Sequence, residues 1–532
     1  MYPAGMDRKV YENEIWFSDK WDPMAYEQNV DFSRPFLEQI LGLFKKVPLY
    51  ARSAVYGVNS DYSNNFTDYK NCYLVFNGNY SEDCMYGTGI SYTKNSIDNS
   101  YLDHCENCYG SFWLKSCSNA FFSSQCSDSF NLFFCKNCIG CTDCFGCMNL
   151  RNKKYHIFNK PYQKEEYQQK IKEFNLGSRR GFVAAEMEVL EFWLRSPVKY
   201  LEGVKNTNVT GDYIWNSKNA ADCYIMIGGE NVKNCQYMEL GPVKDCQDYS
   251  VWGNGAELVY ESMDCGLGAR NIKFCFECWS EVQDIQYSLF SLSSSNLFGC
   301  VGLRKKQYCI LNKQYSKEEY EKLVPKIIDH MNAMPYVDKK GRTYQYGEFF
   351  PLEFSPFPYN QTQAQEHFPF TRDKALLLNY YWEDMKERDY VSTINSSDLP
   401  DDIKDAKESI LNETVLCEFW ERGDREEALQ HNCTKVFRIL LQELKFYQRF
   451  NISLPRHCPN CRYFERTKQK HPLGLLKRKC QCAGTKSENG IYTNTGAHLH
   501  GAGKCPNEFE TSYSPDRPEI VYCEACYNAE VA

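Results

Sequence analysis

The chain has 532 residues, a length that predicts about three or four domains, each large enough to bury a core. Its formal net charge of -8 and its pI near 5.8 exclude a protein that coats nucleic acid over its whole surface, because that affinity comes from basic side chains that release phosphate counterions. The mean hydropathy is -0.58, and no apolar run approaches the roughly 18 residues of a membrane-spanning helix. We therefore expect a soluble protein.

The compartment decides how the cysteines are interpreted. The first residues run directly into charged and aromatic side chains and lack the apolar core of a secretory signal. A cytoplasmic location is expected on this ground. In that reducing environment the 28 cysteines should be thiols or metal ligands, whereas outside the cell they would form a disulfide framework.

Residues 1–60 are expected to form an aromatic and helical cap. Ser33 with Pro35 just after it is a helix-start signal. The apolar spacing from Phe36 to Phe44 predicts an amphipathic helix after that signal. We expect this helix to pack on the region that follows.

Residues 61–150 contain short repeats. An Asn or Asp followed by a small and then a larger apolar residue recurs every 12 positions, at Asn71, Asp83, Asn95, Asn107 and Asn119. Cysteines recur every nine positions at Cys108, Cys117, Cys126, Cys135 and Cys144. Short strands with polar corners and no helical period predict a parallel β-helix-like solenoid. Residues 206–302 repeat this theme, so the predicted fold is mainly β, with a duplicated solenoid.

One phrase of the sequence occurs twice and marks the end of each solenoid. It runs from 145 to 167 and recurs from 298 to 320, at a constant offset of 153 residues. Each copy closes a cysteine-bearing tract and opens a charged, helical one, so we expect a helix to cover the exposed strand edge there. Helical spacing is present over 164–175 and 183–201. A capping box of Ser316 and Glu319 opens a third helix, in which Pro325 predicts a kink or a restart.

The predicted organisation follows from these boundaries. It comprises 1–60, the N-terminal cap; 61–150, the first solenoid; 151–205, a helical joint; 206–302, the second solenoid; 303–345, a helical cap; 346–412, a connector rich in proline and aromatic residues; and 413–532, a double zinc ribbon.

The last region carries the strongest chemical signal, two C-x-x-C pairs with further single cysteines. A tight turn presents two thiolates at once, and Zn²⁺ takes four in a tetrahedron. We predict two structural zinc ions, one held by Cys417, Cys433, Cys458 and Cys461 and the other by Cys480, Cys505, Cys523 and Cys526. Two points stay open: Cys482 competes with Cys480, and His498 or His500 could substitute for a cysteine.

Basic residues gather between the two C-x-x-C pairs, over residues 462–479, a stretch in which Glu465 is the single acid. A cluster of this kind can bind phosphates, and the residues that could contact nucleic acid are Arg466, Lys468, Lys477 and Arg478. The simpler interpretation is a solvated charged loop, because no interleaved set of aromatic side chains offers a stacking platform.

Five cysteines lie three residues apart, at Cys135, Cys138, Cys141, Cys144 and Cys147. They resemble part of an iron-sulfur ligand run, but the fourth spacing and the following proline of such runs are absent. We favour inward packing in the solenoid, since a free cysteine packs as a small apolar residue. The histidines are scattered, and we find no H-E-x-x-H, no G-x-S-x-G and no glycine-rich phosphate loop, so no catalytic residue is predicted.

Distinctive phrases occur at residues 16–23 (Trp-Phe-Ser-Asp-Lys-Trp-Asp-Pro), at 32–36, in both copies of the repeat and at 510–523. Through them nearly the whole chain resembles a family of cysteine-rich zinc-ribbon proteins of candidate phyla radiation bacteria. The resemblance implies a bacterial zinc-binding protein and supplies no activity. Relatives look as if they carry a C-x-x-C pair just before the tryptophan-rich phrase, where this chain has Glu12 and Ile15. We interpret this segment as a relic half-ribbon that cannot bind metal.

The function predicted from the sequence is a non-enzymatic cytoplasmic scaffold that binds zinc and a protein partner, with no membrane association. The alternative is a nucleic-acid or ribosome-associated factor that acts through the basic cluster. A third possibility is an enzyme that uses a cysteine or an iron-sulfur centre.

Overall fold

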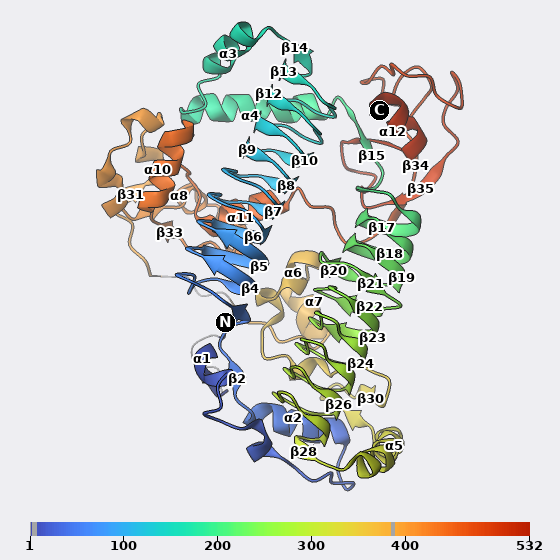
Figure 1. Cartoon of the computed structure of the whole chain (residues 1–532). Helices are drawn as coiled ribbons and strands as arrows, with labels where there is room; N and C mark the ends of the chain where they lie inside the picture. The colour runs from blue at the N-terminus through green and yellow to red at the C-terminus, as the bar shows by residue number, and fades with distance from the viewer. Residues whose placement is uncertain (1, 3–7, 385–388, 532) are drawn as a thin grey trace.

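The computed structural model describes residues 2, 8–384 and 389–531. Two stacks of short parallel strands dominate it, and the described residues also form 12 α-helices. The stacks run in opposite directions from the middle of the molecule, the first toward α3 (Lys164–Glu173) and the second toward α5 (Lys317–Ala333) (Figure 1). The predicted mainly β fold with solenoids of parallel coils and helical caps is confirmed.

One coil of the first stack contains 12 residues, arranged as four sides of three. Parallel partners lie 12 positions apart, as Ser100 and Phe112 do. The last residue of each side turns the corner in the left-handed backbone conformation, for example Asn95 at φ 48° and Asp98 at φ 56°. Asparagine and aspartate tolerate this conformation better than most non-glycine residues, which explains why they recur every 12 positions in the sequence.

The first stack contains a 7-stranded and a 5-stranded sheet. Its strands are β3 (Ala54–Val55), β4 (Asn64–Lys70), β5 (Tyr73–Glu82), β6 (Met85–Ser91), β7 (Ser100–Asp103), β8 (Phe112–Lys115), β9 (Ser118–Phe121), β10 (Ser124–Ser127), β11 (Phe130–Phe133), β12 (Thr142–Phe145), β13 (Lys154–Ile157) and β14 (Lys160–Pro161). The last pair, β13 and β14, is antiparallel and ends the stack.

The second stack is one 13-stranded sheet with a less regular register. Partners lie 11 positions apart at Thr207 and Lys218, and 13 apart at Gln247 and Tyr260. Its strands are β16 (Gly203–Val204), β17 (Thr207–Trp215), β18 (Lys218–Ile227), β19 (Gly229–Lys233), β20 (Gln236–Met238), β21 (Val243–Lys244), β22 (Gln247–Ser250), β23 (Ala256–Met263), β24 (Arg270–Lys273), β25 (Gln283–Gln286), β26 (Ser295–Phe298), β27 (Gln307–Ile310) and β28 (Lys313–Gln314).

Cysteine side chains fill much of both solenoid interiors. Four of them, Cys135, Cys138, Cys141 and Cys144, occupy the four sides of one coil, and Cys147 begins the next. All five are fully buried. Each thiol donates to the backbone carbonyl oxygen two residues earlier, at 3.3 to 3.6 Å. Packing of small side chains, the interpretation that we favoured from the sequence, accounts for their positions.

Helices cover the far end of each stack, at the places that the repeated phrase marks. The first stack is closed by α3 and α4 (Arg179–Trp193) and the second by α5 and α2 (Phe36–Lys46). The glycines of the two copies, Gly146 and Gly299, lie against these helices. A Cβ on Gly146 would meet Val189 of α4 at 3.2 Å, and one on Gly299 would meet Phe36 of α2 at 2.9 Å.

Some details of the predicted helices are wrong. The helix expected over 183–201 ends at Trp193, because the chain then forms β15 (Pro197–Lys199), which pairs with β36 (Ile520–Tyr522). Pro325 does not restart the third helix, since α5 runs through it and its exposed position leaves the freed carbonyl open to water. Ser33 does not cap α2: its hydroxyl bonds to Asp31 at 2.6 Å.

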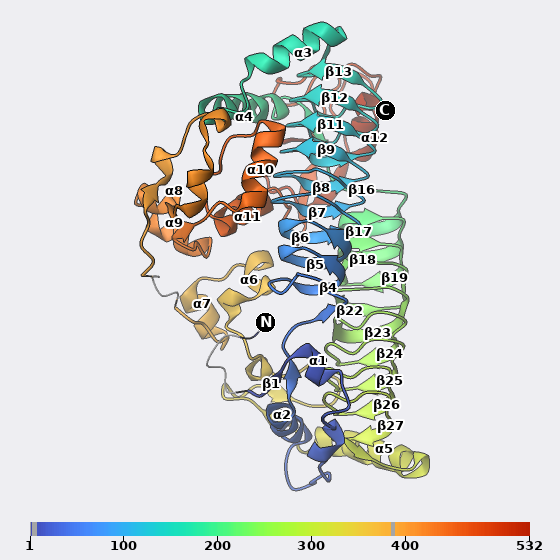
Figure 2. The same ribbon diagram turned by 60° about the vertical axis from the view of Figure 1, so that its left-hand side comes forward.

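The start of the second stack lies beside the middle of the first. Trp113 of β8 stacks on Tyr213 and Trp215 of β17, with ring centroids 4.6 and 5.2 Å apart. The C-terminal region forms two parts that pack on the solenoids. One part lies against the first stack and contains α8 (Glu418–Glu421), α9 (Arg425–Gln430), α10 (Leu441–Phe450) and α11 (Pro459–Thr467) (Figures 1 and 2). The other contains β34 (Leu476–Lys479), β35 (Glu508–Thr511), β36 and α12 (Glu524–Val531). Its β35 contacts β17 at the start of the second stack, and Tyr527 of α12 contacts Asn137 of the first stack. Among the described residues no helix is both long enough and apolar enough to cross a bilayer.

Candidate metal centres

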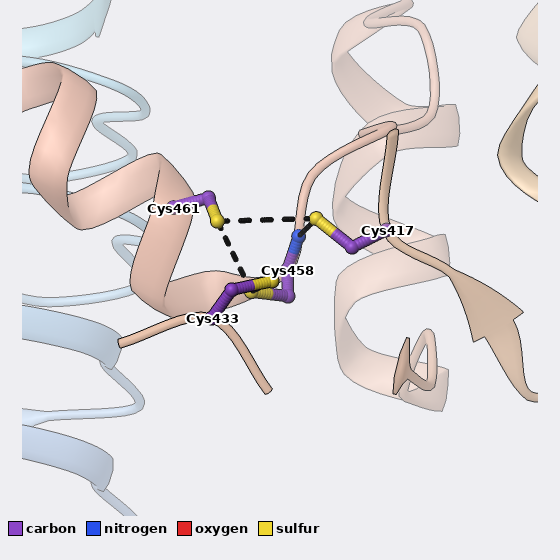
Figure 3. A group of neighbouring side chains, drawn as sticks. All are labelled: Cys417, Cys433, Cys458 and Cys461. Atoms are coloured by element: carbon purple, nitrogen blue, oxygen red, sulfur yellow. Dashed lines mark hydrogen bonds between the residues drawn. The ribbon is translucent and has the colours of Figure 1, made fainter. Parts of the chain in front are cut away.

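Four cysteines from separate turns meet beside the first solenoid, and Figure 3 shows their sulfur atoms pointing toward one another. The sequence positions them at Cys417 after β32 (Val415–Leu416), at Cys433 before β33 (Val436–Phe437), and at Cys458 and Cys461 at the start of α11 (Pro459–Thr467). Pro459 occupies the first helical position, where its fixed φ favours the turn of the C-x-x-C pair. This is the first of the two predicted ligand sets.

The geometry of this group fits a tetrahedral ion. All four sulfur atoms lie within 4.8 Å of one another. The distance is 3.9 Å from Cys417 to Cys461, 3.5 Å from Cys433 to Cys458 and 3.6 Å from Cys458 to Cys461. A tetrahedron with metal–sulfur bonds of about 2.3 Å places its sulfur atoms about 3.8 Å apart. The group can therefore hold a metal ion with little movement.

Local electrostatics favour an anion in the group. Hydrogen bonds from the thiols of Cys417, Cys433 and Cys461 hold the pKa of Cys458 well below its usual range. The backbone N–H of Cys458 lies 3.3 Å from the Cys417 sulfur. Thiolates are the form that binds metal, and N–H donors of this kind stabilise them.

The second predicted set also comes together. Cys480 follows β34 (Leu476–Lys479), and Cys505 precedes β35 (Glu508–Thr511). Cys523 directly precedes α12, and Cys526 lies in its first turn. All four are buried, with their sulfur atoms within 4.8 Å of one another. The Cys505 and Cys523 sulfurs are 3.9 Å apart, and the Cys523 backbone N–H lies 3.2 Å from the Cys480 sulfur.

A neighbouring group contains the residues that the sequence left open. Cys482, His498, His500 and Cys526 present ligand atoms within 4.8 Å of one another. Cys482 thus does not displace Cys480, because the two cysteines face different groups. The two histidines accompany Cys482, and Cys526 belongs to both groups. Sequence reasoning missed Glu530, which contacts His498 Nε2 at 2.8 Å and carries no motif that could reveal this role.

A fourth group is less closed. Glu427, His431 and Glu465 also present ligand atoms within 4.8 Å of one another. Glu427 is exposed and Glu465 is half-buried, and Lys468 contacts both carboxylates at 3.5 and 2.8 Å. Because a lysine cation already contacts both acids and the group is open to solvent, we assign no ion to it.

The basic residues of this region are largely engaged inside the molecule. Arg466 is 6% exposed and pairs with Asp98 of the first solenoid at 3.2 Å. Arg478 donates to the carbonyl oxygens of Tyr513 and Ser514. Lys477 on β34 is exposed, as is Lys468 in the acidic group described above. Of the four cations considered for nucleic acid, the two arginines thus serve contacts within the chain.

A buried ionic network joins the first cysteine group to the solenoid. The Asp98 side chain is 2% exposed and forms ion pairs with both arginines of α11, with Arg462 Nε and Arg466 Nη1 each 3.2 Å from its carboxylate. Arg462 also lies 3.4 Å from Glu443 of α10 (Leu441–Phe450). Each charge has an opposite partner, which burial requires.

The N-terminal segment repeats the local structure of the second cysteine group without its thiols. Strand β1 (Val10–Tyr11) leads into α1 (Asn13–Trp16) as β36 leads into α12, and each strand pairs in parallel with the segment that precedes a solenoid. Glu12 and Ile15 stand at the cysteine positions; Glu12 is exposed and Ile15 is half-buried. The arrangement is consistent with the relic half-ribbon that we inferred from the sequence.

Comparisons with known proteins add little. No family model and no curated protein matches the chain. Among solved structures, one of a candidate acetyltransferase from Desulfovibrio desulfuricans G20 matches at 10% identity, covering 54% of this chain and 84% of that chain, with a TM-score of 0.11. A TM-score this low supports no argument about fold or activity. The resemblance to the candidate phyla radiation family stays a prediction.

Proposed function

We propose that the protein is a non-enzymatic cytoplasmic scaffold in which zinc ions hold the C-terminal modules against two solenoids. The observation that carries this proposal is the buried tetrathiol group of Cys417, Cys433, Cys458 and Cys461. Four cysteine ligands close the coordination sphere and leave no position for water or substrate, which is typical of structural zinc and not of catalytic zinc.

The solenoid surface supports a role in binding a partner protein. Exposed rings stack along one corner of the first solenoid, with centroids 4.9 Å apart between Tyr80 and Tyr92 and 4.5 Å apart between Tyr92 and His104. Such exposed aromatic rows are a common feature of interaction surfaces.

Elemental analysis of the purified protein tests the metal. We expect zinc in stoichiometric amounts, and we expect a strong chelator to lower the thermal stability of the region around α10 and α11 as it removes the ion. A protein purified in zinc-supplemented medium that carries no zinc, and whose stability a chelator leaves unchanged, would contradict the proposal.

Nucleic-acid binding through Lys468 and Lys477 is a weaker proposal, because Arg466 is engaged with Asp98. It predicts salt-dependent retention on RNA or DNA that is lost when the two lysines are replaced by glutamine. No retention at low salt would reject it.

A further inference from the structure

Cys526 occupies a position that a ribbon with one metal ion does not explain. Its sulfur belongs to the group of Cys480, Cys505 and Cys523 and also to the group of Cys482, His498 and His500. A thiolate can bridge two metal ions. Two tetrahedral ions that share one ligand need seven ligand residues, and the two groups together provide seven.

We propose that the C-terminal module holds a binuclear zinc centre bridged by Cys526. One ion takes Cys480, Cys505, Cys523 and Cys526, and the other takes Cys482, His498, His500 and Cys526. This inference rests on the proposed function, since it requires metal in the module, and it adds a second ion with a different ligand set.

The distances fit the second ion. With bonds of about 2.3 Å to sulfur and about 2.0 Å to nitrogen, a tetrahedron places these two atoms about 3.5 Å apart. His498 Nδ1 lies 3.6 Å from the Cys482 sulfur, and His500 Nε2 lies 3.3 Å from the Cys526 sulfur. The ligand atoms are thus close to the positions that they would take around an ion.

Each histidine turns one ring nitrogen toward an oxygen acceptor and the other toward a thiol, so the neutral tautomer that donates to the oxygen leaves the nitrogen facing the thiol without a proton. His498 Nε2 lies 2.8 Å from a carboxylate oxygen of Glu530, which takes its N–H, and the free Nδ1 points to Cys482. His500 Nδ1 lies 2.8 Å from the carbonyl oxygen of Gly503, and its Nε2 points to Cys526. A second hydrogen bond of this kind is how proteins set the tautomer of a metal-binding histidine.

Glu530 gives an independent reason to expect a second ion. Its side chain is fully buried, as is that of His498. The carboxylate accepts the backbone N–H groups of Thr495 and Gly496 and the hydroxyl of Tyr492, at 2.8 to 3.1 Å. A buried carboxylate is costly, and these hydrogen bonds fix the carboxylate that contacts the His498 ring. A carboxylate behind a histidine ligand is a common arrangement at zinc sites.

The charge balance also favours two ions. Four thiolates around one Zn²⁺ carry a net charge of 2 − 4 = −2. Five thiolates and two neutral imidazoles around two Zn²⁺ carry 4 − 5 = −1. The second ion thus halves the charge that the buried centre must accommodate. Asn494 Nδ2 lies 3.2 Å from Cys482 and Asn507 Nδ2 lies 3.3 Å from Cys523, and each donates to a thiolate.

Metal content of matched variants tests the proposal. We expect His500→Gln and Cys482→Ser each to lose one zinc ion per chain relative to the natural protein, measured by elemental analysis. His156→Gln, at a half-buried histidine on β13 of the first solenoid that belongs to none of the four ligand groups, should lose none. If Cys482→Ser and His500→Gln both keep the full zinc content, the second ion is excluded, while zinc in the tetrathiol sites, and with it the proposed function, stands.

Cadmium spectroscopy tests the bridge without any substitution. In protein loaded with ¹¹³Cd we expect two resonances that are coupled to each other through the shared sulfur of Cys526, and an uncoupled resonance from the Cys417 group. One of the coupled resonances should lie upfield, as expected for two sulfur and two nitrogen ligands. Uncoupled resonances throughout would overturn the bridge, and a protein that takes up no cadmium or zinc at all would overturn the proposed function as well.

Discussion

Single cysteines of this chain have two different roles, and position within the fold separates them. Cys458 lies in a group that can hold an ion, whereas Cys126 lies inside the first solenoid among Ser123 and Ser129 at equivalent inward positions. A buried thiol is therefore not by itself evidence of a metal ligand. The neighbours that its sulfur atom meets decide its role.

Replacement of Cys458 should remove one metal ion. We expect Cys458→Ser to lose one zinc per chain and to lower the free energy of unfolding by several kcal/mol, because binding energy of a structural ion is folding energy. Elemental analysis and thermal unfolding measure the two effects. Cys126→Ser is the matched control, and it should keep its zinc because serine already occupies neighbouring inward positions. Equal zinc content in both variants would argue against the first metal site.

A buried acid pair should make stability depend on pH. Burial raises the pKa of Asp264 to about 7, and burial together with the nearby Asp264 charge raises that of Glu277 well above its usual range. Between pH of about 4 and 7 the folded chain then binds more protons than the unfolded chain. The free energy of unfolding should therefore fall as the pH rises through this window, by up to about 1.4 kcal/mol per pH unit from Asp264.

Asp264→Asn tests this origin. It should flatten the fall in unfolding free energy between pH 4 and 7, as measured by denaturant titration at a series of pH values. Asp222→Asn, at an exposed corner of the same solenoid, serves as the control and should leave the slope unchanged. If the slope is identical in all three proteins, Asp264 is not the source of the pH dependence of stability.

At the scale of elements, the solenoid ends depend on close packing of helices. Gly299 has φ +67°, and a Cβ there would lie 2.9 Å from Phe36 and 3.2 Å from Ile40 of α2. This helix precedes the first solenoid in the sequence but closes the second. The N-terminal cap thus ties the two halves together.

Gly299→Ala should loosen this closure. We expect a loss of about 2–4 kcal/mol, from left-handed backbone strain and from the clash with α2. Gly341→Ala is the control. Gly341 has φ +79°, and a Cβ there would have nothing within 4 Å, so this variant should lose only the stability that backbone strain costs. Hydrogen exchange in α2 should rise only in Gly299→Ala. The packing argument fails if both variants lose the same stability and α2 stays protected.

At the scale of the whole molecule, one buried network joins the first cysteine group to the first solenoid. Asp98, on a solenoid corner, holds Arg462 and Arg466 of the helix that carries Cys461. Apolar side chains of both parts surround it in a single core. The network therefore fixes the position of α10 and α11, and with them the first cysteine group, on the first solenoid.

Asp98→Asn should weaken the attachment of α10 and α11 to the first solenoid more than it lowers the stability of the solenoid itself. It leaves the buried Arg466 guanidinium without its anion and leaves Arg462 with Glu443 alone, which costs about 3–5 kcal/mol. We expect faster hydrogen exchange in α10 and α11, with little change in β11 and β12. Asp103→Asn, which breaks an exposed pair with Lys115, should cost less than about 1 kcal/mol. Comparable losses in the two variants would show that the network does not hold the module.

The sequence by itself determined the features that repeat locally. The 12-residue recurrence of Asn71, Asp83 and Asn95 reports a backbone corner that each coil must form, and the repeated phrase reports the end of each stack. The two sets of four cysteines could also be predicted, because thiols in short turns at C-x-x-C spacing have few other roles in a reducing environment. The repeat period and the backbone corners depend on residues that are close together in the sequence, so both can be predicted without the tertiary structure.

Only the tertiary structure decided how distant side chains meet. From the sequence we expected Arg466 in a surface patch. In the structure it is buried, because it pairs with Asp98, which is far away in the chain. Cys480 and Cys482 looked like competitors until the fold turned them toward different groups, one of them completed by His498 and His500. These contacts depend on loops that have no repeating sequence pattern and on residues that can be hundreds of positions apart. Whether a charged side chain or a thiol is buried therefore depends on contacts that form only in the folded chain.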